Sequence, residues 1–213
     1  MRLDQIWRYP VKSMGGERLE QGELHVDGIA GDRMVAVLSP EGRIVTSRTR
    51  PKLLGHHAVL GPDGEPLVDG RPWRDPAVAR DVVAAAGAGC RLATAAEVGP
   101  GRFDVLPLLV ATDGAIAAFG RDGRRLRPNL VIGGVEGLAE RGWEGRRLRI
   151  GACIVALADL RGRCVMTTFD PDTLVQDAGV LRDIVERFDG TMALNASVEG
   201  SGVLRVGDPV ELL

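Results

Sequence analysis

A cysteine flanked by an arginine and two threonines is the most reactive grouping in the sequence. Cys164 directly follows Arg163, and Thr167 and Thr168 come shortly after it. A neighbouring cation stabilises a thiolate over a thiol, and the thiolate is the form that binds a metal or attacks an electrophile. Soft sulfur ligands suit soft or high-valent metals. The grouping therefore predicts a metal ligand or a nucleophile, whereas a small buried hydrophobic side chain is the alternative for any lone cysteine.

The residues after this grouping predict a turn. In Asp170-Pro171-Asp172-Thr173, the Asp side chains can accept hydrogen bonds from nearby backbone amides, and proline presets one dihedral angle. We expect Cys164 to lie on a strand that runs into this constrained loop, where functional residues often collect. Asp170 could relay protons near a metal, but the proline that follows favours its role in folding the turn.

Other cationic motifs could hold an anion or a polar ring. Lys12 and Ser13 precede two glycines whose backbone amides could approach an anion closely. Arg33 and Arg48 carry guanidinium groups, which bind phosphate through paired hydrogen bonds. Solvated surface cations are the alternative for all three, because lysine and arginine are mostly exposed. Arg127 and Asn129 flank Pro128, and they could bind the edge of a heterocycle or simply form a turn before a strand.

Five ordered motifs resemble those of MOSC-domain proteins, the molybdenum-cofactor-binding relatives of amidoxime-reducing enzymes and of the cofactor sulfurase C-terminal domain. The motifs span nearly the whole chain. They are Tyr9-Pro-Val-Lys12-Ser13, Gly31-Asp32-Arg33, Val45-Thr46-Ser47-Arg48, Arg127-Pro128-Asn129-Leu-Val-Ile and Arg163-Cys164-x-x-Thr-Thr-x-Asp-Pro-Asp-Thr. Many members have glycine where this chain has Leu174.

The resemblance implies a role for each matched residue. Cys164 would be the protein's ligand to molybdenum, with Asp170 as a second catalytic candidate. The cofactor, a molybdenum atom held by molybdopterin, would contact Lys12, Ser13, Arg33, Arg48, Arg127, Asn129, Arg163, Thr167 and Thr168.

The resemblance also implies an activity. The leading function is a molybdenum-dependent oxidoreductase that reduces N-hydroxylated small molecules such as hydroxylamines and amidoximes. The three cysteines cannot supply a four-cysteine iron–sulfur cluster, and no haem-attachment motif occurs, so electrons should come from a separate ferredoxin-like or flavin-containing protein. A non-redox module that carries or helps to sulfurate the cofactor is the alternative. A small structural barrel without the ligand is a third, which the joint presence of Cys164, Lys12, Arg33 and Arg127 argues against.

The composition of the chain excludes several classes of protein. The chain has 213 residues, with 45% hydrophobic and 26% charged residues, as in ordinary globular proteins. A net charge of -2 indicates no nucleic-acid-binding surface by bulk charge. The N-terminus lacks an apolar signal core and no run is long enough for a membrane span, so we expect no membrane association. Few, scattered cysteines predict a reducing, cytoplasmic setting.

Short strands at regular spacing predict a β-rich α+β fold with a barrel or sandwich. We expect an N-terminal β-barrel-like domain (1–95) packed on a MOSC β-barrel domain (96–213), with a few short helices and the cofactor between the two. Strands are expected at 3–9, 24–26, 33–38, 43–48, 52–60, 65–68, 106–111 and 127–132, and hairpins at 148–157 and 204–212. Helices are expected from Asp75 to Gly87, over 115–119 and over 180–188.

Overall fold

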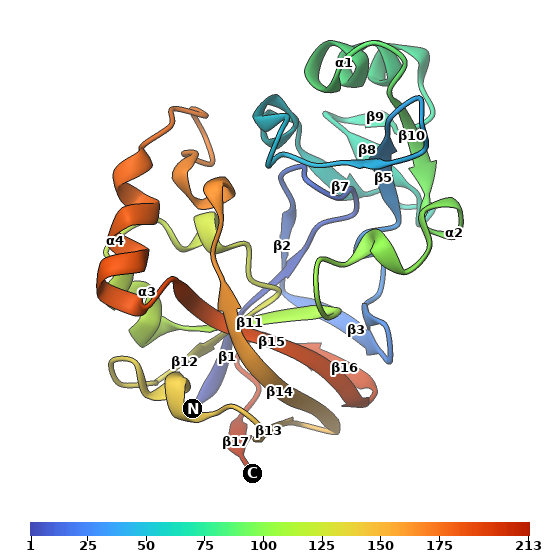
Figure 1. Cartoon of the computed structure of the whole chain (residues 1–213). Helices are drawn as coiled ribbons and strands as arrows, with labels where there is room; N and C mark the ends of the chain where they lie inside the picture. The colour runs from blue at the N-terminus through green and yellow to red at the C-terminus, as the bar shows by residue number, and fades with distance from the viewer.

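A large mixed sheet forms the lower part of the molecule (Figure 1). The computed structural model describes residues 1–213, the whole chain. Eight strands follow the order β17-β13-β14-β15-β11-β12-β1-β2, and all neighbours are antiparallel except β11 and β12. They are β1 (Arg2–Arg8), β2 (Glu17–Leu19), β11 (Leu108–Thr112), β12 (Leu130–Gly133), β13 (Arg147–Ile150), β14 (Cys153–Gly162), β15 (Thr191–Gly200) and β17 (Val210–Leu212).

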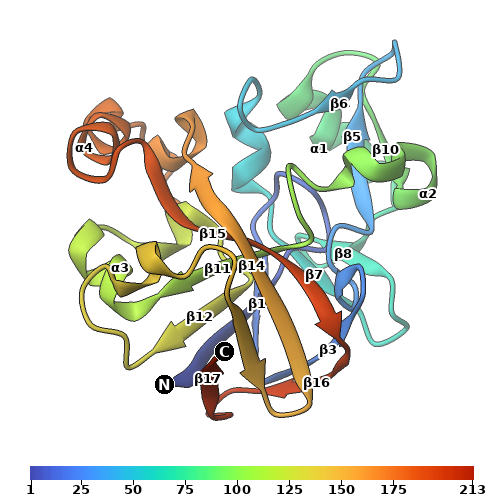
Figure 2. The same cartoon turned by 60° about the horizontal axis from the view of Figure 1, so that its bottom comes forward.

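Three small sheets complete the β-structure. Their orders are β10-β5-β6, β16-β3-β4 and β7-β8-β9. The strands are β3 (Gln21–His25), β4 (Gly28–Ile29), β5 (Val35–Leu38), β6 (Ile44–Val45), β7 (Ala58–Leu60), β8 (Pro66–Val68), β9 (Arg71–Pro72), β10 (Arg91–Thr94) and β16 (Gly202–Arg205). The sheets that contain β5 and β8 lie with helix α1 in an upper unit, away from the large sheet (Figures 1 and 2).

Four short helices begin at polar caps. In α1 (Pro76–Ala86), Asp75 accepts a hydrogen bond from the Ala77 amide at 2.7 Å, as its sequence predicts. Thr112 caps α3 (Asp113–Phe119) in the same way, and Asp177 caps α4 (Ala178–Phe188). The predicted helices are thereby confirmed. Helix α2 (Ala95–Val98) was not predicted, although Thr94 and Glu97 form a reciprocal capping box at its start.

The buried apolar residues form three separate clusters. A cluster of twenty buried residues lies mainly on the large sheet and includes Leu24, Ile29 and Leu204 of the sheet β16-β3-β4. Eleven more buried residues form the core of the upper unit. A third cluster joins α3 to α4 on one side of the sheet. The helical spacing of Val180, Leu181, Ile184, Val185 and Phe188 predicts a buried stripe on α4. Val180, Ile184 and Phe188 are buried there, whereas Val185 is 56% exposed, so the stripe is narrower than predicted.

The β-rich α+β class is confirmed, but no closed barrel forms. The end strands β17 and β2 of the large sheet do not pair. The isolated bridge of Arg2 to Pro209 and three backbone hydrogen bonds link the start of the chain and β1 to residues 207–210. Strand pairing also crosses the predicted boundary at residue 95. β1 pairs with β12 and β3 pairs with β16, so the two predicted parts share sheets.

Three local predictions differ from the structure. Residues 204–212 are not a hairpin, because β16 pairs with β3 whereas β17 pairs with β13. The predicted strand 52–60 begins instead as the 3-10 helix Pro51–Gly55, since proline suits a helix start. The predicted strand 43–48 shortens to β6, because the backbone turns back when the Thr49 and Arg50 amides bond the Thr46 carbonyl.

Candidate active site

Cys164 lies at the start of a tight turn just beyond the end of β14. We expected Cys164 on a strand, but β14 ends at Gly162. Cys164 is instead the N-terminal cap of the 3-10 helix Val165–Thr168, where the chain turns. The Thr167 hydroxyl donates to the Cys164 carbonyl at 2.9 Å, and the Thr168 hydroxyl donates to the Val165 carbonyl at 2.6 Å. Both threonines are buried, so their hydroxyls fix the turn that holds the thiol. Cofactor contact by these hydroxyls stays a prediction.

The carboxylate of Asp170 makes its hydrogen bonds within its own turn and to Arg125. Its Oδ1 accepts from the backbone amides of Asp172 and Thr173 at 3.1 and 3.0 Å, and Arg125 donates to Oδ2 at 3.0 Å. These hydrogen bonds, the amide of Thr173 first, hold the pKa of Asp170 below its usual value. The carboxylate is not among the lining residues of the pocket that holds Cys164. The geometry favours the turn role over a catalytic one.

The turn also carries the departure from the family pattern. Leu174 has a φ of 58°, in the left-handed region that favours glycine. Its side chain lies close to Gly55 of the upper unit, where a Cβ added to Gly55 would be 2.9 Å from Leu174 Cδ1. This leucine therefore joins the turn to the 3-10 helix opposite it.

The pocket around Cys164 is strongly cationic. It has a volume of about 70 Å³ and takes residues from both parts of the chain. Its charged lining consists of six arginines and one carboxylate, namely Arg33, Arg48, Arg125, Arg127, Arg161, Arg163 and Asp104. The excess of guanidinium groups over carboxylates predicts an anionic ligand.

Two of these arginines lack a carboxylate partner. Arg163 donates from Nη2 to the Leu126 carbonyl at 2.8 Å, but its buried Nε–H has no partner. Burial lowers the pKa of Arg163 to about 10. Arg127 has a left-handed backbone and lies over the Tyr9 ring at 4.2 Å, and burial lowers its pKa as well. These two side chains retain donors for a ligand.

Lys12 and Ser13 form a smaller hollow beside this pocket, together with Arg33 and Arg127. Lys12 is only 6% exposed, so it is not a solvated surface cation. Its Nζ donates to the carbonyls of Gly101 and Arg102 and to Asp104 at 2.8 Å. Ser13 is also buried and has a φ of 72°.

The remaining predicted cofactor contacts, Arg33, Arg48 and Asn129, already have partners within the protein. Arg33 lines the pocket but pairs with its neighbour Asp32, whereas Arg48 is about half exposed and reaches Asp104 at 3.5 Å. Asn129 lines the pocket too, but it accepts from the Leu109 amide and donates to the Trp7 carbonyl and to Asp32. Its amide therefore ties β1 to β11 and is largely satisfied without a ligand.

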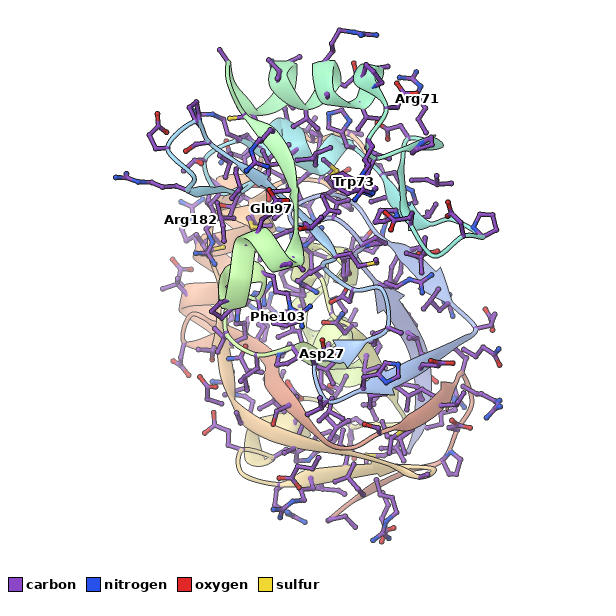
Figure 3. The ribbon with its side chains drawn as sticks, turned by 90° about the vertical axis from the view of Figure 1, so that its right-hand side faces the viewer. Asp27, Arg71, Trp73, Glu97, Phe103 and Arg182 are labelled. Carbon is purple, nitrogen blue, oxygen red and sulfur yellow. The ribbon has the colours of Figure 1, made fainter.

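Four polar or charged residues that line the pocket were not predicted from the sequence, namely Asp104, Arg125, Arg161 and Asn195. Asp104 pairs with Lys12, with Arg48 and, at 3.1 Å, with Arg161, and these cations lower its pKa to about 2 against the effect of burial. Arg161 also donates to Asn195 at 2.9 Å. Asp104 belongs to the connector after α2, which Figure 3 shows with Phe103 between Glu97 and Asp27. The connector folds back and brings the Asp104 carboxylate to Lys12, which is distant in sequence, so no local sequence pattern predicts this ion pair.

The other cysteines lie away from the pocket. Cys153 is buried in the main core, and burial raises the pKa of its thiol. Cys90 packs at the edge of the upper core. Cys164 is therefore the only thiol that lines the pocket.

Known proteins share both parts of this architecture. The MOSC N-terminal beta barrel domain matches residues 1–68, and the MOSC domain matches residues 116–211. The chain belongs to the MOSC-domain family.

Among relatives of this MOSC protein, mitochondrial amidoxime reducing component 2 of Macaca fascicularis is 26% identical, over 97% of this chain and 82% of the relative. Mitochondrial amidoxime-reducing component 1 of Homo sapiens is 26% identical, over 98% and 82%. The crystal structure of the YuaD protein from Bacillus subtilis has the same fold, with a TM-score of 0.54 at 12% identity over 99% of this chain and 94% of that one. No helix of the MOSC protein has the length and apolar character needed to cross a membrane.

The residues present fit the cofactor that the family is associated with. A molybdopterin carries a phosphate and a polar ring system, and the pocket offers the unpaired Arg127 guanidinium and the orphaned Arg163 Nε–H. The Cys164 thiol in the same pocket is a soft ligand of the type that such a metal accepts. The pocket therefore combines a thiol that suits the metal with cationic donors that suit the phosphate and the polar ring.

Proposed function

We propose that this MOSC protein is a molybdenum-cofactor-dependent oxidoreductase that reduces N-hydroxylated compounds. The observation that carries the proposal is the single lining thiol, Cys164, within a pocket of six arginines. The names of the amidoxime-reducing relatives support the reaction class. The N–O bond would break with uptake of two electrons and two protons, and the N–H compound and water would leave.

The chain's own residues have distinct parts in this proposal. When bound, the cofactor would supply the two-electron chemistry. Cys164 would ligate the metal, held in place by the turn that Thr167 and Thr168 close. Arg127 and Arg163 would donate to the anionic and polar edges of the cofactor, in surroundings of reduced dielectric where charged hydrogen bonds strengthen.

Electrons would come from a separate protein of ferredoxin-like or flavin-containing type. The chain's three cysteines are dispersed between the upper core, the main core and the pocket, so they cannot together ligate an iron–sulfur cluster. A reducing cytoplasmic setting belongs to the same proposal, since Cys164 must remain a free thiol.

The test begins with cofactor-loaded protein. Metal and pterin analysis should give molybdenum and molybdopterin in equal amounts. Reduced viologen should then support reduction of hydroxylamine or an amidoxime, whereas NADH or NADPH alone should not. Loaded protein that stays inert with the viologen across several N-hydroxylated compounds, and instead passes its cofactor to an apo-enzyme, would identify a carrier.

A further inference from the structure

One exposed segment of the upper unit carries four cations and no carboxylate. It spans residues 43–52, from the residue before β6 into the 3-10 helix Pro51–Gly55. Its cations are Arg43, Arg48, Arg50 and Lys52, and all four residues are exposed. We call these ten residues the basic segment. In Figure 2 it runs from β6 to the 3-10 helix, which faces the turn that follows Cys164.

Two arginines of the basic segment make only weak or uncharged contacts within the protein. Arg48 Nη2 lies 3.5 Å from Asp104, and that carboxylate is shared with two other cations. Arg50 donates to backbone carbonyls, among them that of Ala86 at 2.8 Å from its Nε. A carbonyl carries no net charge, so the charge of Arg50 stays uncompensated.

The two outer cations, Arg43 and Lys52, have no carboxylate partner. Both residues are exposed, and neither side chain makes a hydrogen bond or an ion pair within the chain. The basic segment therefore presents a positive potential to solvent, although the whole chain has a net charge of -2. A local patch of this kind attracts an acidic partner and steers its approach.

The basic segment also borders the Cys164 pocket. Arg48 lines that pocket while its side chain remains 47% exposed. The 3-10 helix ends at Gly55, where an added Cβ would be 2.9 Å from Leu174 Cδ1. Val175 follows Leu174 and is 66% exposed, so an apolar side chain lies near the cations. Apolar contact surrounded by charged and polar groups is typical of protein–protein interfaces.

From these observations we infer that the basic segment is the docking surface for an acidic one-electron donor protein. The inference rests on the proposed function and deepens it by giving the charge of the donor and its place of contact. The donor carries carboxylates around its redox centre, and Arg43, Arg50 and Lys52 bind them. The redox centre then faces the edge of the pocket at Arg48.

The electron count of the proposed reaction requires a weak interface. Cleavage of the N–O bond takes two electrons and two protons, whereas a one-electron carrier supplies one electron at each encounter. Two donor molecules must therefore dock, transfer an electron and leave in every turnover. Attraction between surface charges satisfies this requirement, because it speeds association more than it slows release. Redox encounters accordingly bury little surface, below about 1,200 Å² in total.

Binding of an acidic [2Fe–2S] ferredoxin tests the docking surface independently of turnover. Isothermal titration calorimetry at about 50 mM salt should show binding to cofactor-loaded protein. The double variant Arg43→Glu/Lys52→Glu should raise the Kd about tenfold or more. At about 500 mM salt wild type and variant should differ by less than about threefold, because salt screens exposed charges beyond a few ångströms.

The matched control is the double variant Arg146→Glu/Arg205→Glu, which also reverses two charges. Both arginines are exposed. Arg146 directly precedes β13 and Arg205 ends β16, in the lower part of the molecule away from the upper unit (Figure 1). This control should bind ferredoxin within about twofold of wild type. Reduced viologen should drive hydroxylamine reduction equally in wild type and both variants, because a small donor needs no docking surface.

Several results would overturn the inference. They are absence of ferredoxin binding at low salt, equal weakening by the two double variants, and loss of viologen-driven turnover in Arg43→Glu/Lys52→Glu. A short DNA duplex that binds as tightly as ferredoxin, and is weakened by the same variant, would assign the basic segment to nucleic acid instead.

The two measurements also separate this inference from the reductase proposal. Viologen-driven turnover with ferredoxin binding that the variant leaves unchanged would refute the docking surface and support the reductase. Salt-sensitive ferredoxin binding that the variant weakens, without viologen-driven turnover, would support the docking surface and refute the reductase.

Discussion

Asp104 allows the energetics of the site to be measured without any cofactor. The Asp104→Asn variant keeps the shape of the side chain but removes the carboxylate charge that faces Lys12, Arg48 and Arg161. These cations lower its pKa from 3.8 to about 2, which corresponds to about 2.4 kcal/mol at 1.36 kcal/mol per pKa unit. Because about a third of the side chain is exposed, solvent screening reduces the expected loss to about 1–2 kcal/mol.

The effect should appear as lower thermal stability of cofactor-free protein at pH 7. For a chain of this size, each kcal/mol lowers the Tm by about 2–4 °C, so we expect a decrease of about 2–8 °C. When the folded-state pKa of a carboxyl lies below its unfolded-state pKa, the ionised group stabilises the folded protein at pH values above the unfolded-state pKa. This stabilisation is lost as the pH falls through the folded-state pKa. The difference between wild type and variant should therefore stay constant above about pH 5 and close between about pH 4 and 2.

Calorimetric melts across this pH range provide the assay. Asp189→Asn is the matched control, because Asp189 also pairs with an arginine, Arg141, but its side chain is 91% exposed. We expect a loss of at most about 0.5 kcal/mol for that variant. A Tm of Asp104→Asn equal to that of wild type at pH 7, or a difference that persists below pH 2, would refute the electrostatic role of Asp104.

Three further predictions concern the thiol, a free arginine and a buried acid. Cys164→Ala should abolish activity and alter the sulfur coordination of molybdenum seen by X-ray absorption, whereas Cys90→Ala should retain both. Arg127→Gln should lower pterin occupancy at limiting cofactor about tenfold or more, since a hydrogen bond to a charged group contributes about 1.5–3 kcal/mol, and the exposed Arg121→Gln should not. Glu140 is 1% exposed, and burial raises its pKa. As the pH rises through that raised pKa, the buried Glu140 must ionise, which lowers the stability of the folded protein. Glu140→Gln removes this charge, so it should increase the Tm at pH 8 but not at pH 4.

Local sequence determined much of the fold and the heart of the site. The helix starts at Asp75 and Thr112 follow from side-chain caps that act within three residues. The turn at Asp170 is equally local, because its carboxylate bonds amides two and three residues ahead. The ordered motifs around Lys12, Arg127 and Cys164 identified the family, which the comparisons confirm.

Tertiary structure alone decided which of these residues meet and what they contact. Asp104 is about ninety residues from Lys12 in sequence, and no local pattern places its carboxylate on that amine. The pairing of β16 with β3 and of β17 with β13 likewise separates two strands whose shared apolar pattern predicted a hairpin. A cleft lined by Leu54, Met166 and Phe169 likewise takes its walls from segments far apart in the sequence. Caps and turns depend on neighbours along the backbone, whereas pockets and ion-pair networks depend on long-range packing, which sequence spacing does not encode.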